Sequence, residues 1–427
     1  MPRENVLVEE VSELTLVAAA ETRYHAVVFA GGSSARLDLE DSRATGWLAA
    51  LEQMRAAGLT AYVEVDPATG VIVEVLCPLP VVVGELRESD DGVDVELVVS
   101  HARHRLSRTN REFGELLAAL RRAQENQEPV LVTETLDEHE IIDVRPDPKV
   151  RAESVETGES EVLGTPVTLA KANEVFTLVN NRTACSANPI APGIPFTYPD
   201  DGCWGRAHEM CRLMIGAGVQ PDKVWIYGGL HVVSFNKPDC TVGWFWHVAP
   251  TLTLTTGETY VVDPALFPGP VPRATWASVQ GDPAATLVPT GADVFHRGSD
   301  GALTFDPTYS KTNAVLARWR TELQLRAAGA SGPPPYANCL ALPPRTQWFG
   351  TIAGNTSHRW FTFGWPANWH VVWTIMPTLI CPGTPTLSWS VAVERASATT
   401  QVTYWFTVTN SSPHTVRFEG RYDVLST

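Results

Sequence analysis

Apolar and polar residues alternate along the first third of the chain in short runs that are typical of β-strands. These runs, which include YHAVVF, AYVEV, GVIVEVLC and VDVELVVS, are separated by the turn-forming sequences DPATG and SDDG. Two longer stretches place their apolar residues at helical spacing instead, as Phe113, Leu116, Leu117 and Leu120 do in RTNREFGELLAALRRAQENQ. Residues 1–145 are therefore predicted to form an α+β domain with two amphipathic helices.

Two stretches without hydrophobic periodicity divide the rest of the chain. Residues 146–164 are charged and begin with a proline-containing segment, and residues 327–338 read AAGASGPPPYAN. Both compositions are typical of linkers. The sequence thus predicts a central domain over residues 165–326 and a C-terminal domain over residues 339–427.

The C-terminal domain returns to a strand-like alternation. It holds seven of the chain's 14 tryptophans, and segments such as LSWSVAVE and QVTYWFTVTN alternate apolar and polar residues between turns. This pattern predicts an antiparallel β-sandwich with a largely aromatic core. The expected fold class of the whole chain is α+β, with this sandwich as an accessory domain.

Charge is distributed unevenly along the 427 residues. The formal net charge is −16, and residues 1–150 alone hold 28 acidic and 14 basic side chains. Nucleic acids and anionic membranes are bound by basic patches, so this balance argues against both as partners. No apolar run approaches the roughly 18 residues of a membrane helix, so no membrane span is expected.

The first residues are acidic where a secretory signal would need an apolar core. Glu4, Glu9, Glu10 and Glu13 interrupt this region, so we expect no secretory signal in this sequence. Seven cysteines are an odd and sparse set, which predicts no dense disulfide framework. At least one thiol must therefore stay free within the chain.

One of these cysteines, Cys203, opens a predicted helix in the segment YPDDGCWGRAHEMCRL. Free N–H groups at a helix start favour an anion by roughly 0.3–2 kcal/mol. Because one pKa unit corresponds to about 1.4 kcal/mol, the helix lowers the pKa of the thiol by about one unit at most. Gly202 lets the chain turn sharply into the helix. A nucleophilic role for Cys203 therefore requires an imidazole partner as well.

The sequence offers two candidate bases for this thiol. His208 lies five residues on and about 140° around the helix, so we expect it to have a supporting role in packing or hydrogen bonding. His247 lies in the strand-like run GWFWHVAPTL, and Asp263 ends the next strand, TYVVDPALF. Neighbouring strands that carry a histidine and an aspartate can place the carboxylate against the imidazole, so Cys203, His247 and Asp263 are the candidate catalytic residues.

Two other interpretations of these residues stay open at this point. Cys203 can be an ordinary buried cysteine, with His247 at a strand end and Asp263 in a turn. A zinc site formed by Cys203, His208 and Cys211 is disfavoured, because these side chains do not share one helical face and no CxxC or HxxxH pair completes the ligands. We expect neither a metal nor a cofactor.

At these residues the sequence resembles the bacterial protein-glutaminase family of protein-glutamine deamidases. The resemblance rests on FTYPDDGCWGRAHEM, VWIYGGL, WFWHVA and VVDPALF, in that order, and covers about residues 165–325. It implies a papain- or transglutaminase-like central domain with Cys203 as nucleophile, His247 as base and acid, and Asp263 orienting the imidazole. Arg206 and His208 match the family's RAH motif and would support the helix.

The sequence also departs from the family pattern. Trp204 and Gly205 stand where the family has Tyr and Ala, and Ala314 replaces a Cys. Cys240 falls where family members carry cysteines, with Cys185 as one candidate partner. These departures concern the disulfide pattern rather than the chemistry.

The resemblance implies hydrolysis of glutamine side-chain amides in protein or peptide substrates through a Cys203 thioester, with release of ammonia. Trp204, Trp244 and Trp246 would wall the glutamine slot, or they are core aromatics. A transglutaminase or a thiol protease would use the same three residues, and a non-catalytic interaction protein is the alternative from another class.

The family members are secreted and carry a removable pro-region, so the resemblance favours an exported protein, and without export a cytoplasmic one. For residues 1–145 we expect an inhibitory domain that covers the site, or else a targeting or partner-binding domain.

Overall fold

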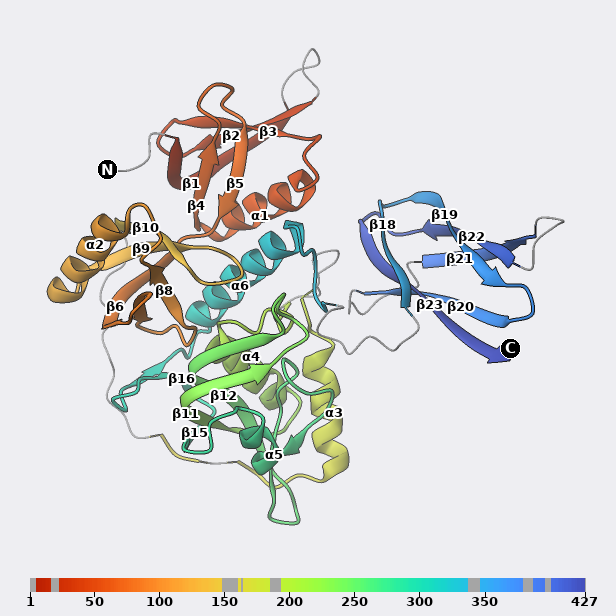
Figure 1. The fold of residues 1–427 in the computed structure, drawn as a ribbon. Helices are drawn as coiled ribbons and strands as arrows, with labels where there is room; N and C mark the ends of the chain where they lie inside the picture. The colour runs from red at the N-terminus through yellow and green to blue at the C-terminus, as the bar shows by residue number, and fades with distance from the viewer. Residues whose placement is uncertain are drawn as a thin grey trace.

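The protein has a mixed α+β fold, as the sequence predicted, and the strands in its sheets pair antiparallel (Figure 1). The computed structural model describes residues 5–16, 23–147, 160–162, 164–184, 193–336, 346–378, 387–395 and 401–426. The predicted linkers 146–164 and 327–338 lie partly outside the described residues, as Cys185 does entirely. No helix in the described ranges is long and apolar enough to cross a membrane.

The N-terminal region contains a first unit of five strands and one helix, residues 6–76. Its elements are β1 (Val6–Leu16), β2 (Tyr24–Phe29), β3 (Ser34–Asp38), α1 (Ala44–Ala57), β4 (Thr60–Val65) and β5 (Ile72–Leu76). The strands are ordered β3-β2-β1-β4-β5 in the sheet. Helix α1 buries Trp47, Leu51 and Met54 against the sheet, in agreement with the helical spacing of its sequence.

A second unit, residues 79–146, repeats this architecture. Its elements are β6 (Leu79–Glu88), β7 (Gly92–Leu97), β8 (His104–Ser107), α2 (Phe113–Asn126), β9 (Pro129–Glu134) and β10 (Ile141–Pro146). Read from the opposite edge, the sheet order is β8-β7-β6-β9-β10, which matches the first unit strand for strand. The region that the sequence pattern suggested as one α+β domain is thus two copies of one β-β-β-α-β-β unit.

The central region is built around a five-stranded sheet of order β14-β13-β12-β11-β15. Its elements are α3 (Leu169–Asn180), α4 (Cys203–Gly216), β11 (Asp222–Val233), β12 (Thr241–Thr253), β13 (Thr259–Val261), β14 (Val271–Pro272), α5 (Arg273–Ser278), β15 (Thr286–Gly291), β16 (Val294–Arg297), β17 (Leu303–Phe305) and α6 (Ser310–Ala328). Helix α4 contributes to one continuous core with β12 and with the second unit. The core of the second unit is therefore not independent of the central region.

Helix α6 joins the central region to both N-terminal units. Leu325 on α6 is fully buried in the core of the first unit. The guanidinium of Arg318 on the same helix donates hydrogen bonds to the backbone carbonyls of Cys77 and Pro78, where the first unit passes into the second. Figure 1 shows α6 between the first unit and the green central sheet.

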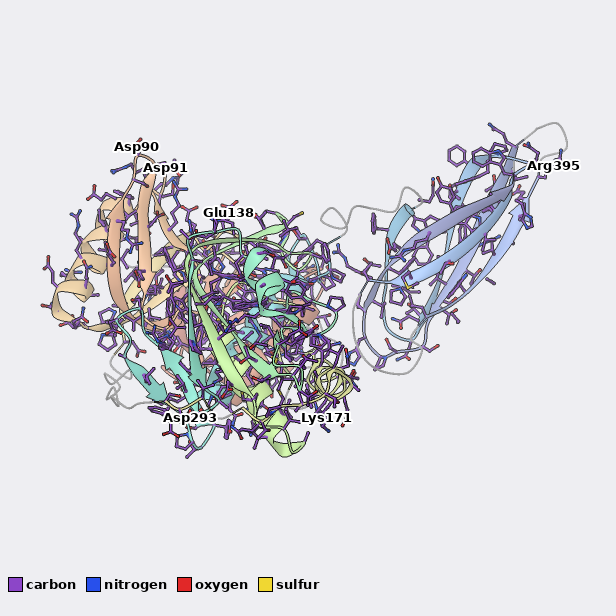
Figure 2. All side chains as sticks on the ribbon, turned by 90° about the horizontal axis from the view of Figure 1, so that it is seen from below. Asp90, Asp91, Glu138, Lys171, Asp293 and Arg395 are labelled. Atoms are coloured by element: carbon purple, nitrogen blue, oxygen red, sulfur yellow. The ribbon has the colours of Figure 1, made fainter. Side chains whose placement is uncertain are left out.

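The C-terminal strands form two packed three-stranded sheets, as expected for a β-sandwich. Their elements are β18 (Thr346–Ile352), β19 (Thr356–Pro366), β20 (His370–Pro377), β21 (Leu387–Glu394), β22 (Gln401–Asn410) and β23 (Val416–Ser426). The sheet orders are β18-β23-β20 and β19-β22-β21. Trp365, Trp373 and Phe406 lie in the core between them, which explains the tryptophan-rich sequence. Figure 2 shows Arg395 at the end of the sandwich farthest from the rest of the protein.

Candidate active site

Cys203 is the first residue of α4, and the glycine before it makes this position possible. Gly202 has a left-handed φ of 79°, which a residue with a side chain rarely adopts. A Cβ at Gly202 would also lie 2.1 Å from Cδ1 of Trp319 on α6. The turn into the helix and the close packing of α6 thus both require glycine here. The Cys203 side chain is buried, with 1% of its surface exposed.

The segment before Cys203 is held by Arg206, one turn into the same helix. The buried guanidinium donates hydrogen bonds to the backbone carbonyls of Tyr198 (3.0 Å) and Asp201. The Oδ1 atom of Asp201 in turn accepts a hydrogen bond from the Gly202 N–H at 2.7 Å. Arg206 therefore fixes the turn that positions the thiol, rather than reaching the thiol itself.

His247 and Asp263 are brought together by the central sheet. His247 lies on β12, and β13 pairs with β12 antiparallel two residues before Asp263. Nε2 of His247 lies 2.8 Å from Oδ2 of Asp263, and the indole N–H of Trp276 donates to the same oxygen at 2.9 Å. Burial opposes ionisation of Asp263, but His247 and these hydrogen bonds lower its pKa below the usual value. The Asp263 carboxylate is thus in direct contact with both the His247 imidazole and the Trp276 indole.

Cys203 and His247 converge with a third residue, His101. Each of the three offers one ligand or proton-accepting atom, and these atoms all lie within 4.8 Å of one another. Burial raises the pKa of the Cys203 thiol well above its usual value, although Arg206 acts in the opposite direction. Burial therefore acts on the pKa of the thiol in the direction opposite to the one expected from the helix start.

His101 comes from the second N-terminal unit, in the loop of residues 98–103 between β7 and β8. Ala102 forms an antiparallel bridge with Trp244 on β12, and the Phe245 N–H donates to the His101 carbonyl at 3.0 Å. Nδ1 of His101 lies 2.9 Å from the carbonyl oxygen of Trp246. The loop thus lies along β12 like an added strand and places an imidazole beside Cys203.

The three candidate tryptophans of the slot surround this imidazole. The ring centroid of His101 lies 5.1 Å from that of Trp246, 5.3 Å from Trp244 and 6.2 Å from Trp204. Trp244 also stacks on His247 at 4.5 Å. All three indoles are at most 7% exposed. The tryptophans therefore line a space that the side chain of His101 fills.

His208 lies apart from this cluster. Its Nδ1 lies 2.9 Å from Nζ of Lys223, and burial together with the Lys223 charge lowers its pKa to about 3. Cys211 is a buried free thiol about two turns farther along the same helix than Cys203. Among the described residues, Cys203, His208 and Cys211 do not form a group whose ligand atoms converge.

A second buried network joins the second unit to the segment before Cys203. Glu134 on β9 contacts both His104 and His139, with 2.9 Å between Nδ1 of His139 and Oε2 of Glu134. Nε2 of His139 lies 3.3 Å from Oδ1 of Asp200, and Arg326 on α6 donates to Asp200 at 2.6 and 3.0 Å. These contacts tie the second unit to the turn that carries the thiol.

Two features of this region are not evident from the sequence pattern. The segment SHARH holds two of the chain's 11 histidines within four residues. The sequence does not show which distant residues these histidines contact, and only the fold places the segment beside β12. Cys240 is disulfide-bonded, and because Cys77, Cys203 and Cys211 are free, none of these is its partner.

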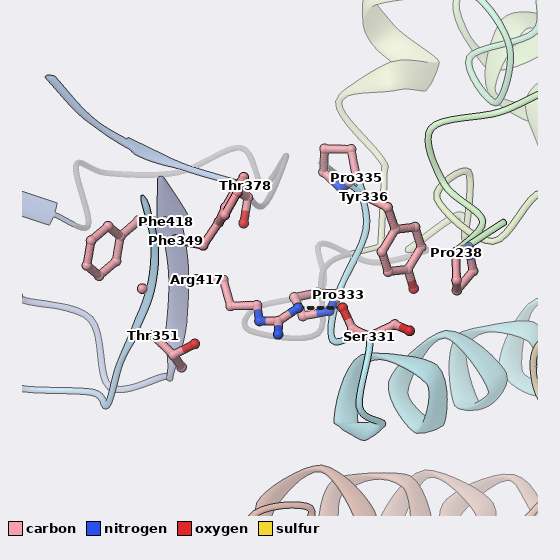
Figure 3. Close-up of a pocket in the computed structure, with 11 residues that line it drawn as sticks. Pro238, Ser331, Pro333, Pro335, Tyr336, Phe349, Thr351, Thr378, Arg417 and Phe418 are labelled. Carbon is pink, nitrogen blue, oxygen red and sulfur yellow. Dashed lines mark hydrogen bonds between the residues drawn. The ribbon is translucent and has the colours of Figure 1, made fainter. Parts of the chain in front are cut away.

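A large groove lies away from this cluster. It has a volume of about 590 Å³ and lies between the segment of Ser331 to Tyr336 and the sandwich strands that carry Phe349 and Arg417 (Figure 3). Among the described residues that line it there is no histidine, cysteine or carboxylate. We therefore place the candidate chemistry at Cys203 rather than in the groove.

Comparisons with known proteins found similarity to glutaminases. Residues 172–280 match a family model described as glutaminase. The chain is similar to a crystal structure of pro-protein-glutaminase, with 23% identity over 62% of this chain and 98% of that one, and a TM-score of 0.44. A crystal structure of protein-glutaminase is 28% identical over 36% of this chain and 88% of that one, with a TM-score of 0.33.

The protein-glutaminase of Chryseobacterium proteolyticum, solved by NMR, is also 28% identical, over 35% of this chain and 84% of that one, with a TM-score of 0.32. A comparison with curated proteins found no match. Because the TM-scores are below 0.5, we base the proposals below on the contacts of the site and on the family match. Residues 172–280 thus match the glutaminase family, and the residues matched by this family model include neither N-terminal unit nor the sandwich.

Proposed function

We propose that the protein is a protein-glutamine deamidase whose nucleophile is Cys203. The observation that carries the proposal is the 2.8 Å contact between His247 and Asp263 beside a cysteine at a helix start, inside a segment that matches a glutaminase family. A thiol, an imidazole and an orienting carboxylate in this order are the groups that acyl transfer requires.

In the proposed reaction, His247 takes the proton of Cys203 and the thiolate attacks the side-chain amide carbon of a glutamine. Backbone N–H groups at the start of α4 stabilise the oxyanion. His247 then protonates the departing nitrogen, so that ammonia leaves and a thioester remains. Water, deprotonated by His247, attacks the thioester to yield glutamate and the free thiol.

We further propose that the second N-terminal unit keeps the full chain latent. The 98–103 loop bridges to β12, and His101 fills the space between the three tryptophans. A glutamine side chain cannot enter while that imidazole is present. Cleavage of the chain between the second unit and the central region would free the site.

The test is ammonia release from a glutamine-containing protein, measured with the full chain before and after limited proteolysis. We expect release only after proteolysis, and a gain of about one dalton per converted glutamine in the substrate. Cys203→Ala should reduce the rate to less than about a thousandth. The matched control is Cys211→Ser, because Cys211 is a buried free thiol on the same helix. Equal rates for Cys203→Ala and the unaltered protein would refute the proposal.

A transglutaminase would pass the same thioester to a lysine amine. Addition of a fluorescent primary amine to the same assay separates the two reactions. Incorporation of the amine in place of ammonia-plus-glutamate formation would assign the transferase, and cleavage of the substrate backbone would assign a protease.

A further inference from the structure

The His101, Cys203 and His247 side chains have the character of a metal site that bridges two parts of the chain. His101 belongs to the second N-terminal unit, whereas Cys203 and His247 belong to the central region. At most 1% of each residue's surface is exposed, and their ligand atoms all lie within 4.8 Å of one another. Neighbouring ligand atoms of a tetrahedral zinc ion lie roughly 3.5 Å apart, so a modest contraction would bring the three into coordination.

Each histidine has one ring nitrogen held by a partner and the other left over. Nδ1 of His101 faces the Trp246 carbonyl at 2.9 Å, and Nε2 of His247 faces Asp263 at 2.8 Å. Nε2 of His101 and Nδ1 of His247 are buried and have no hydrogen-bond partner among the described residues. Metal-binding histidines show this arrangement, in which a carbonyl or carboxylate accepts from one nitrogen and the metal occupies the other.

In a second cluster of described residues, by contrast, every histidine ring nitrogen has a polar contact. Ligand atoms of His104, Glu134 and His139 also converge, but Glu134 contacts both imidazoles directly. The remaining nitrogens face Ser100 at 2.6 Å and Asp200 at 3.3 Å. No ring nitrogen of His104 or His139 is left for an ion, whereas one on each of His101 and His247 is.

The surroundings of the three residues also suit a divalent cation. Asp201 Oδ1 lies 3.4 Å from Nε2 of His101, so a carboxylate is close to one of the three residues, although it lies outside the group whose ligand atoms converge. A cation bound here would deprotonate the Cys203 thiol, which is a soft ligand suited to zinc.

We propose that the latent chain binds one zinc-class divalent ion through Nε2 of His101, Sγ of Cys203 and Nδ1 of His247. Such an ion would link the second unit to the central region and occupy the thiol and the imidazole at once. Displacement of the second unit removes one ligand, which weakens the ion's hold on the other two. The regulatory meaning of the site rests on the proposed function, whereas the binding of the metal does not.

The test is titration of the full chain with Co²⁺, added both to the native protein and during refolding because the three residues are buried. We expect one ion per chain and a near-ultraviolet absorption band from the cobalt–thiolate bond, which Zn²⁺ then abolishes by displacement. Cys203→Ser should lose the band, and His101→Ala should weaken binding by about tenfold or more. Cys211→Ser is the matched control and should bind as the unaltered protein does.

Folding of each variant is checked by circular dichroism, and His101→Gln provides a second, polar replacement that preserves most of the side-chain volume. Absence of the cobalt–thiolate band, or an affinity in both His101→Ala and His101→Gln equal to that of the unaltered protein, would overturn the metal site. Cobalt binding without glutamine deamidation by the cleaved protein would leave the site standing and refute only the proposed function. Deamidation by the cleaved protein without cobalt binding by the full chain would support the proposed function and refute only the metal site.

Discussion

The two N-terminal units share one architecture but differ in what their loops contact. Both contain three strands, a 14-residue helix and two further strands, paired in the same order. In the first unit, residues 30–33 (AGGS) join the second and third strands, whereas in the second unit residues 98–103 (VVSHAR) do so. The short loop makes a tight turn with Gly32 at φ 88°, and the longer one reaches β12 and Cys203. The same scaffold thus serves as packing for α6 in one copy and as a cover for the thiol in the other.

Replacement of the 98–103 loop by the AGGS sequence of the first unit should have the largest effect. The variant would lack the bridge to β12 and the imidazole between the tryptophans, so the site would be open in the full chain. If the conformation in which the loop covers the site is favoured over the open one by about 3 kcal/mol, ammonia release by the uncleaved variant should rise by about a hundredfold. A rate as low as that of the unaltered full chain would show that other contacts keep the site closed.

A pair of leucine truncations compares the cores of the two units. Leu325 on α6 is fully buried in the core of the first unit, and Leu120 is fully buried in that of the second. Leu325→Ala and Leu120→Ala should each lower the free energy of unfolding by about 2–5 kcal/mol, measured by urea denaturation. Only Leu120→Ala should also raise ammonia release by the uncleaved chain. A similar rise in both variants would contradict a distinct role for the second unit.

The buried His104–Glu134–His139 network exists only in the second unit and should make its attachment depend on pH. Burial lowers the pKa of His139, but Asp200 and Glu134 outweigh this and raise it to about 9. Burial raises the pKa of Glu134, but His104 and His139 outweigh this and lower it to about 2.

The stabilisation from His139 is therefore complete below its ordinary pKa of 6.5 and is lost as the pH rises through about 9. That from Glu134 is complete above 4.5 and is lost as the pH falls through about 2. We expect His139→Asn to lower the thermal midpoint most between pH 4.5 and 6.5, and progressively less toward pH 9. A difference that stays constant over this range would argue against a charged His139.

The smallest expected effect concerns the left-handed residues at which helices α1 and α2 end. Helix α1 ends at Gly58 with φ 64°, whereas α2 ends at Gln127 with φ 52°, also left-handed. Gln127→Gly should therefore raise the free energy of unfolding by about 1 kcal/mol, and Gly58→Gln should lower it by a similar amount. A Cβ at Gly58 would have no neighbour within 4 Å, so Gly58→Gln isolates the backbone preference from packing, whereas Gln127→Gly also removes the 2.8 Å hydrogen bond from the Gln127 side chain to the Gln124 carbonyl. Equal signs in the two variants would show that neighbouring residues outweigh the preference.

Much of the architecture followed from local patterns. The run YHAVVF forms β2, the two amphipathic stretches form α1 and α2, and the tryptophan-rich tail forms the sandwich. The duplication of the N-terminal unit was not evident, because strand order depends on which distant runs pair and not on the period within each run. The domain boundaries stay predictions.

The sequence by itself determined the candidates for chemistry: Cys203 behind a glycine at a helix start, and His247 and Asp263 on successive strands. These are local properties of helix starts and strand spacing, and the catalytic roles of the three residues stay predictions. Only the tertiary structure decided that His101, about a hundred residues before Cys203, has a ring nitrogen within 4.8 Å of the Cys203 sulfur. It also decided that the thiol is buried. The burial raises the pKa of Cys203, and it depends on which distant chain segments exclude water from the thiol. Periodicity reports which face of an element is apolar, but contact between distant segments is set by packing of the whole chain.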